Sequence, residues 1–102
     1  MIPTRSMPVP VRRYLVHGRV QGVGFRAFVA RQIERTAVTG WIRNVGRTTV
    51  EAVASGTLEE LALLERALRT GPINARVDRF EVHDTQDTPG DHGFTIARSV
   101  KE

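Results

Sequence analysis

The 102-residue chain contains no cysteine, which excludes disulfide bonds and thiolate chemistry. It also lacks any apolar run near the ~20 residues that a membrane-spanning helix needs. Residues 1–10 hold three prolines but no apolar signal-peptide segment. We therefore expect a soluble, cytoplasmic protein with no membrane partner. Residues 1–10 are expected to be a disordered leader, and residues 11–102 are expected to form one domain.

Acidic side chains are fewer than basic ones, 11 against 15, which gives a formal net charge of +4. Such a balance favours anionic partners, from phosphorylated metabolites to nucleic acid. A general richness in arginine explains the same charge, so composition leaves both readings open. The histidines His17, His83 and His92 show no spacing typical of a metal site, and we expect neither a metal nor a cofactor.

Hydrophobic periodicity predicts the secondary structure. We expect strands at residues 12–17, 38–45, 49–54, 76–83 and, briefly, 94–96, with an irregular start to the fourth at Val77. A helix is expected from Phe25 to about Thr36. A second begins with the capping box formed by Thr57 and Glu60 and ends at residues 71–72. Its predicted buried stripe consists of Leu58, Leu61, Leu64 and Leu68.

This order of elements is typical of a ferredoxin-like α+β sandwich, βαββαβ, with a short extra C-terminal strand. Two helices are expected to cover one face of an antiparallel sheet and to leave the other face largely to water. In this topology the first two strands run parallel on either side of the third. Residues 18–24, which follow the first strand, and Asn44, near the end of the second, are therefore expected to face one another.

Three glycines, Gly18, Gly22 and Gly24, fall between the first strand and the first helix. A glycine-rich loop that leads into a helix N-terminus favours anion binding, because its amides can converge on an oxyanion beside the positive end of the helix dipole. Arg26 adds a planar cation in the first helical turn. The alternative is a connection that merely turns the chain.

Two motifs in this order closely resemble the signatures of the acylphosphatase family. The first is Gly-Arg-Val-Gln-Gly-Val-Gly-Phe-Arg at residues 18–26, and the second is Gly-Trp-Ile-Arg-Asn at residues 40–44. The resemblance spans about residues 12–98. It implies that Arg26 and Asn44 are catalytic and that the phosphate-binding loop consists of Gly18, Arg19, Val20, Gln21, Gly22, Val23 and Gly24.

The resemblance implies hydrolysis of an acyl phosphate to a carboxylate and inorganic phosphate, by direct attack of an oriented water and without a metal. This sequence departs from the family pattern at Ala37, where members often carry glycine, and in the turn at residues 46–49, where the glycine comes early. If Ala37 were left-handed it would be strained by ~1 kcal/mol, and Ala37→Gly would raise the melting temperature.

Three other functions remain as alternatives. A nucleic-acid-binding module of this topology would stack bases on aromatic side chains of the sheet, but residues 49–54 contain none, so we expect no nucleic-acid partner. A catalytically silent anion-binding domain would use the same loop. A detached domain of a larger maturation protein would normally be followed by cysteine-bearing zinc segments, which this chain lacks. We expect a monomer.

Overall fold

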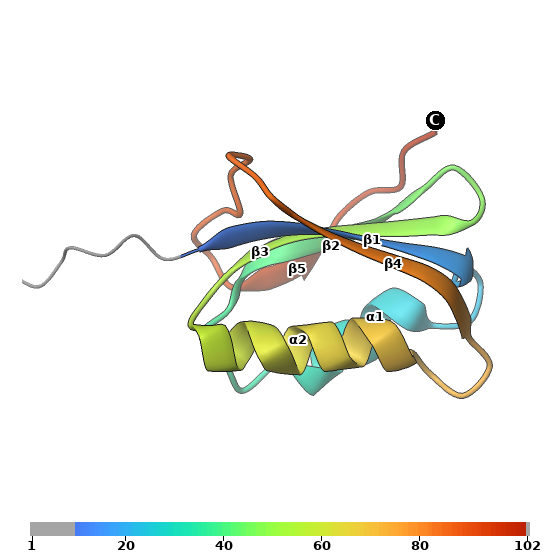
Figure 1. Ribbon diagram of the computed structural model, residues 1–102, viewed down its shortest axis with the longest axis horizontal. Helices are drawn as coiled ribbons and strands as arrows, with labels where there is room; N and C mark the ends of the chain where they lie inside the picture. The colour runs from blue at the N-terminus through green and yellow to red at the C-terminus, as the bar shows by residue number, and fades with distance from the viewer. Residues whose placement is uncertain (1–9, 102) are drawn as a thin grey trace, which may run out of the picture.

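The computed structural model describes residues 10–101 of the chain, which form five strands and two helices (Figure 1). The expected leader lies outside the described residues, except for Pro10. The elements are β1 (Val11–Arg19), α1 (Phe25–Gln32), β2 (Thr39–Val45), β3 (Thr49–Ser55), α2 (Leu58–Thr70), β4 (Arg76–Asp84) and β5 (Phe94–Ile96).

The five strands form one sheet in the order β4-β1-β3-β2-β5. β1 pairs antiparallel with both β3 and β4, and β2 pairs antiparallel with β3. The short extra strand β5 instead runs parallel to β2. The sheet is therefore mixed, whereas the sequence analysis expected an antiparallel one. The ferredoxin-like order is confirmed, and it places β3 between the parallel strands β1 and β2.

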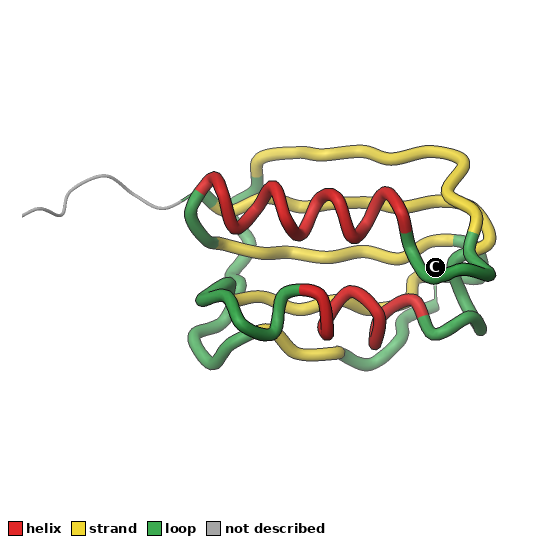
Figure 2. Tube along the Cα trace, turned by 90° about the horizontal axis from the view of Figure 1, so that it is seen from below, coloured by secondary structure: helices red, strands yellow, loops and turns green. Residues whose placement is uncertain are grey.

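Both helices cover one face of the sheet, as predicted (Figures 1 and 2). Tyr14 and Val16 of β1 point to this side and are fully buried, and so is Ile42 of β2. Helix α1 adds the buried side chains of Phe25 and Val29 to this core. Helix α2 adds those of Leu61, Leu64, Ala67 and Leu68. Alternation along each strand therefore determines which side chains reach the helix side.

The first helix is shorter than predicted, because it ends at Gln32 and not near Thr36. The hydroxyl and the backbone N–H of Thr36 both donate to the carbonyl oxygen of Ile33, at 2.7 and 3.0 Å. This tight turn closes the helix while Ile33 remains buried, so the apolar periodicity continues past the helical hydrogen bonds.

The expectation for Ala37 is wrong. No residue other than glycine has a positive φ between residues 10 and 101, so Ala37 carries no left-handed strain. The predicted stabilisation by Ala37→Gly therefore loses its basis, because glycine would only add conformational freedom to the unfolded chain.

The second helix begins with the predicted capping box, in which Thr57 and Glu60 each accept a hydrogen bond from the other's backbone N–H at 3.1 Å. Leu58 does not belong to the buried stripe, since it is 65% exposed. Side chains tilt toward the N-terminus of a helix, and the side chain of this first helical residue therefore extends past the part that packs on the sheet.

A β-bulge explains both the irregular start of β4 and the need for Gly18. His17 pairs with Arg79 but Gly18 pairs with Val77, so Asp78 is the extra residue. A Cβ atom on Gly18 would lie 2.3 Å from the carbonyl oxygen of Arg76. Only glycine fits this approach of β1 to β4, and the bulge brings Val77 onto the core side with Phe80.

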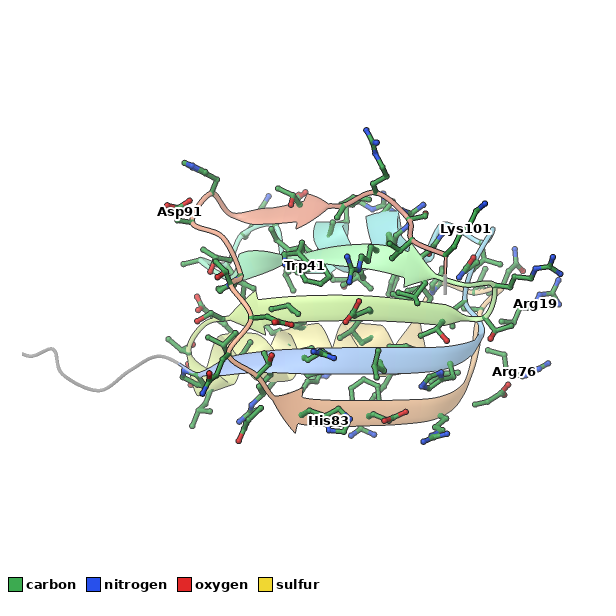
Figure 3. The ribbon with its side chains drawn as sticks, turned by 90° about the horizontal axis from the view of Figure 1, so that it is seen from above. Arg19, Trp41, Arg76, His83, Asp91 and Lys101 are labelled. Atoms are coloured by element: carbon green, nitrogen blue, oxygen red, sulfur yellow. The ribbon has the colours of Figure 1, made fainter. Side chains whose placement is uncertain are left out.

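The face of the sheet opposite the helices, here called the open face, is less exposed to water than expected. Glu51 is 7% exposed and Val53 is fully buried. The loop that follows β4, residues 85–93, crosses this face. Figure 3 labels His83 just before the loop and Asp91 near its far end. The indole Nε1 of Trp41 donates to the carbonyl oxygen of Thr88 at 3.2 Å, which holds the crossing segment against the sheet.

Candidate active site

Arg26 and Asn44 both line one cleft. Arg26 belongs to the first turn of α1, which begins at one end of the sheet (Figure 1). The cleft has a volume of about 200 Å³. It is lined by Val20, Gln21, Gly22, Gly24, Phe25, Arg26, Ala27, Asn44 and Ile96. The sequence prediction that the glycine-rich loop and Asn44 face one another is therefore met in the geometry.

The alternation of β2 directs Asn44 toward the cleft. Asn44 follows the fully buried Ile42 by two residues, so both side chains leave the strand on the helix side. Trp41 and Arg43 lie on the opposite face, where the Arg43 guanidinium stacks 4.6 Å from the centre of the Trp41 ring. The Asn44 side chain therefore lies on the same side of the sheet as α1 and Arg26.

The glycine-rich loop leaves backbone donors available. Gly22 and Gly24 have φ values of 74° and 79°, which glycine adopts without steric cost. Within residues 10–101, the N–H groups of residues 21–24 donate to no protein acceptor. Gly24 is also the N-cap of α1, whose first turn contains no acidic residue. These free donors and the positive end of the helix favour an anion in the cleft.

Arg26 is held by the C-terminal segment. Its Nη1 donates to the carbonyl oxygen of Ala97 at 3.3 Å, and it makes no ion pair with any carboxylate among the described residues. One side of the guanidinium is therefore fixed by an uncharged acceptor, so its charge remains available to a ligand.

Only some of the expected phosphate-binding residues line the cleft. Gly22, Gly24, Val20 and Gln21 line the cleft, whereas Gly18, Arg19 and Val23 are not among its lining residues. Gly18 is committed to the bulge described above. Arg19 is exposed and lines a different hollow, with His17, Thr48 and Arg76.

Gln21 has a structural task that the motif alone did not reveal. Its Nε2 lies within hydrogen-bond distance of three carbonyl oxygens, those of Val45, Gly46 and Thr49, at 3.3, 3.2 and 2.9 Å. The carboxamide therefore ties the loop to the β2–β3 turn and keeps it beside Asn44.

The sequence interpretation missed the cleft residues Phe25, Ala27 and Ile96 and the carbonyl group of Ala97. The segment 97–101 continues along β2, although it follows the last predicted strand. The Val100 N–H donates to the Asn44 carbonyl at 2.9 Å, and the Gly46 N–H donates to the Val100 carbonyl at 2.9 Å. Backbone groups carry no side-chain signature, so no sequence signal pointed to this support.

His17 lies away from the cleft. Its side chain is on the open face, with Nδ1 3.0 Å from Thr49 Oγ1 and Nε2 2.8 Å from Glu81 Oε2. Among residues 10–101, no group of three or more His, Cys, Asp or Glu side chains is arranged to hold a metal ion. None of the helices in this part of the chain is long and apolar enough to cross a membrane.

Fold and cleft together define a ferredoxin-like α+β domain with an arginine and a glycine-rich loop at one end of the sheet. The chain belongs to the acylphosphatase family, whose family model, described as Acylphosphatase, matches residues 12–96.

Proteins named acylphosphatase are similar to this chain in sequence and in structure. The one from Nitratidesulfovibrio vulgaris is 51% identical over 76 residues, which cover 74% of this chain and 76% of the relative. That from Azorhizobium caulinodans is 42% identical over 86 residues, or 84% and 92% of the two chains. The crystal structure of acylphosphatase from Bacillus subtilis superimposes with a TM-score of 0.77 at 33% identity, covering 85% of this chain and 97% of that one.

Proposed function

We propose that this protein is an acylphosphatase that hydrolyses acyl phosphates to a carboxylate and inorganic phosphate by direct attack of water, without a metal. The observation that carries the proposal is the convergence of Arg26, Asn44 and the glycine-rich loop on one cleft.

The loop and Arg26 would hold the phosphoryl group. The N–H groups of residues 21–24, which pair with no acceptor in the described part of the chain, supply donors for its oxygens. The planar fork of the Arg26 guanidinium suits two oxygens at once. Phosphoryl transfer passes through a loose transition state, so positioning and charge stabilisation account for most of the catalysis. The loop N–H groups and the Arg26 guanidinium can supply both the positioning and the charge stabilisation.

Asn44 would orient the attacking water. As the bond between the water oxygen and phosphorus forms, the bond from phosphorus to the carboxylate oxygen breaks, and the carboxylate leaves with the electron pair. The conjugate acid of that leaving group has a pKa of about 4, so no general acid is needed. An alkyl phosphate would need one, and among residues 10–101 no Asp, Glu or His lines the cleft. We therefore expect selectivity for acyl phosphates over alkyl phosphates.

Hydrolysis of benzoyl phosphate in the presence of excess chelator tests this proposal. We expect the wild type to turn over and Arg26→Ala to lose roughly 10³-fold in kcat/KM together with inhibition by inorganic phosphate. Asn44→Ala is expected to lose about 10³-fold in kcat while phosphate still inhibits it. Arg31→Ala, which removes an exposed arginine from the same helix, is the matched control and should stay near the wild-type rate.

Three outcomes would contradict the proposal. Phosphate binding without turnover would favour the silent anion-binding domain. A full rate in Asn44→Ala would remove its role in orienting water, and comparable turnover of an alkyl phosphate would remove the leaving-group argument. The expected cytoplasmic location, the monomeric state and the absence of a nucleic-acid partner stay predictions.

A further inference from the structure

A hydrogen-bonded chain of three side chains lies on the open face, outside the cleft. His17 Nδ1 is 3.0 Å from the hydroxyl oxygen of Thr49, and His17 Nε2 is 2.8 Å from Oε2 of Glu81. None of these three residues lines the cleft. A hydroxyl, an imidazole and a carboxylate connected in this order form the arrangement that activates a nucleophile in many hydrolases.

The register of the sheet brings these side chains together. His17 of β1 pairs directly with Thr49 of β3. On its other side His17 pairs with Arg79 of β4, and Glu81 follows Arg79 by two residues. Residues two apart in a strand share a face, so all three side chains of the chain point away from the helices. Figure 3 looks onto this face, on which β1 lies between β3 and β4.

The contacts of Glu81 determine where the proton of His17 lies. Glu81 also contacts His83 at 3.1 Å and Arg79 at 3.2 Å. Hydrogen bonds from His83 and then His17 hold the pKa of the Glu81 carboxyl below its usual value. An ionised carboxylate only accepts hydrogen bonds, so a neutral His17 carries its proton on Nε2. Nδ1 then accepts from the Thr49 hydroxyl, which is the direction in which a general base removes the hydroxyl proton.

Thr49 carries the only hydroxyl among residues 10–101 that contacts an imidazole. The hydroxyls of Tyr14, Thr36 and Thr57 bond instead to a carboxylate, a carbonyl and a backbone N–H. Thr49 is partly exposed, and the side chain of His17 is 29% exposed. A small molecule can therefore approach both the hydroxyl and the base from solvent.

A hollow of about 630 Å³ opens beside this pair. Its lining includes His17, Arg19 and Thr48, the residue before Thr49. In the described part of the chain Arg19 forms no ion pair with a carboxylate, whereas Arg76 in the same hollow is already paired. The Arg19 guanidinium can therefore donate to a substrate carbonyl oxygen and stabilise the negative charge that forms on it during attack.

We propose that Thr49 and His17 form a second active site, which hydrolyses small activated carboxylic esters through an acyl group carried on Thr49. Thr49 Oγ1 attacks the carbonyl carbon, and its proton passes to His17 Nδ1. His17 gives this proton to the leaving oxygen as the ester C–O bond breaks. Water then attacks the acyl group on Thr49, and a proton of the water returns through His17 to Thr49 Oγ1 as the acid leaves. Glu81 is a positioning residue that holds the imidazole, and Arg19 stabilises the oxyanion.

Hydrolysis of p-nitrophenyl acetate tests this proposal. We expect the wild type to release p-nitrophenolate in a burst and to carry an acetyl group on Thr49 after acid quenching, as detected by peptide mass spectrometry. Thr49→Val keeps the shape and the strand preference of threonine but removes the hydroxyl. It should lose the burst, the acetyl group and about 10²-fold in rate, the lower end of what a positioned base contributes. Thr49→Ser keeps a hydroxyl and should retain the burst and the acetyl group.

The matched control is Thr95→Val, which removes an exposed threonine hydroxyl from β5 and should leave the burst unchanged. Glu81→Gln should slow the burst about tenfold, because a misplaced imidazole is a poorer base. The size of the burst should stay the same, because Glu81 does not carry the acyl group.

A folded wild type without a burst would overturn the proposal, and so would a burst that persists in Thr49→Val or an acetyl group found on a histidine or lysine instead. Inorganic phosphate, which would occupy the cleft, should not inhibit the hydrolysis of p-nitrophenyl acetate. Inhibition as strong as that of benzoyl phosphate hydrolysis would place the ester in the cleft and overturn the proposal as well. Failure of the wild type to hydrolyse benzoyl phosphate would refute only the proposed function.

Discussion

The open face of the sheet and the end that holds the cleft are both rich in arginine, but they differ in where the carboxylates lie. On the open face Glu51 lies between Arg43, at 2.8 Å, and Arg13, at 3.5 Å. Beside it, Glu81 contacts His17, Arg79 and His83 at 2.8 to 3.2 Å. At the cleft, Arg26 faces an uncharged carbonyl.

This difference teaches how one chain uses the same side chain for two purposes. A guanidinium that faces a buried carboxylate is neutralised and contributes to stability, whereas one that faces a carbonyl keeps its charge for a ligand. Substitutions on the open face should therefore change folding and spare catalysis, and those around the cleft should do the opposite.

The largest stability effect is expected for Glu51→Gln on the open face. Removing the charge leaves Arg13 and Arg43 without their shared partner in a partly buried site. We expect a loss of about 2 kcal/mol in the free energy of unfolding, less than for a fully buried pair because both arginines are partly exposed. Urea denaturation measures this loss, and the kcat of the folded enzyme should stay near the wild-type value.

The matched control is Glu59→Gln, which removes an exposed carboxylate from α2. It should change the free energy of unfolding by a few tenths of a kcal/mol at most, about the usual effect of a surface substitution. Equal stability of the two variants would show that the buried carboxylate adds nothing.

A smaller effect, of the opposite kind, is expected for Val100→Pro near the cleft. Proline removes the N–H that donates to the Asn44 carbonyl. Small displacements of a positioning group are costly for catalysis, so we expect kcat for benzoyl phosphate to fall about tenfold while inhibition by phosphate persists. Val100→Ala keeps the N–H and should behave like the wild type. A kcat unchanged by proline would show that the C-terminal segment does not position Asn44.

The smallest effect is expected from acid on the open face. Hydrogen bonds from His83 and then His17 hold the pKa of the Glu81 carboxyl below its usual value. Its ionised form therefore stabilises the folded state fully above the usual pKa of about 4.3 for glutamate. That contribution is lost as the pH falls through the lower, folded-state pKa.

Melting temperatures of the wild type and of Glu81→Gln between pH 6 and pH 3 measure this contribution. As the pH falls, the melting temperature of the wild type should decrease by more than that of the variant. Parallel curves would mean that the contacts of Glu81 do not stabilise the folded state.

The sequence predicted the arrangement of the cleft because the relevant patterns are local. Alternation in β2 determines the side to which Asn44 points, and the position of β3 between β1 and β2 brings the two motifs to one end. The end of α1 could not be predicted, because the hydroxyl and the backbone N–H of Thr36 close the helix on the Ile33 carbonyl while the apolar pattern continues.

The rest of the site depends on contacts between residues far apart in the chain. Ala97 holds Arg26 through a backbone carbonyl, and no side-chain pattern marks such a group. The motif placed Gln21 in the phosphate-binding loop, yet its carboxamide contacts the β2–β3 turn, which only the folded chain brings within reach. For Gln21 the sequence identified the right region but not the atoms that the side chain contacts, and for Ala97 it carried no signal at all.

The outermost strand β4 has a consequence for how copies of this protein meet. A long strand at the border of a sheet offers unpaired backbone groups to which a second molecule can add its own strand. Over its nine residues β4 carries a bulge and the ionisable side chains of Arg76, Asp78, Arg79, Glu81, His83 and Asp84. An approaching copy would have to strip water from these charges and match an uneven backbone, so the border of this sheet resists aggregation by strand addition.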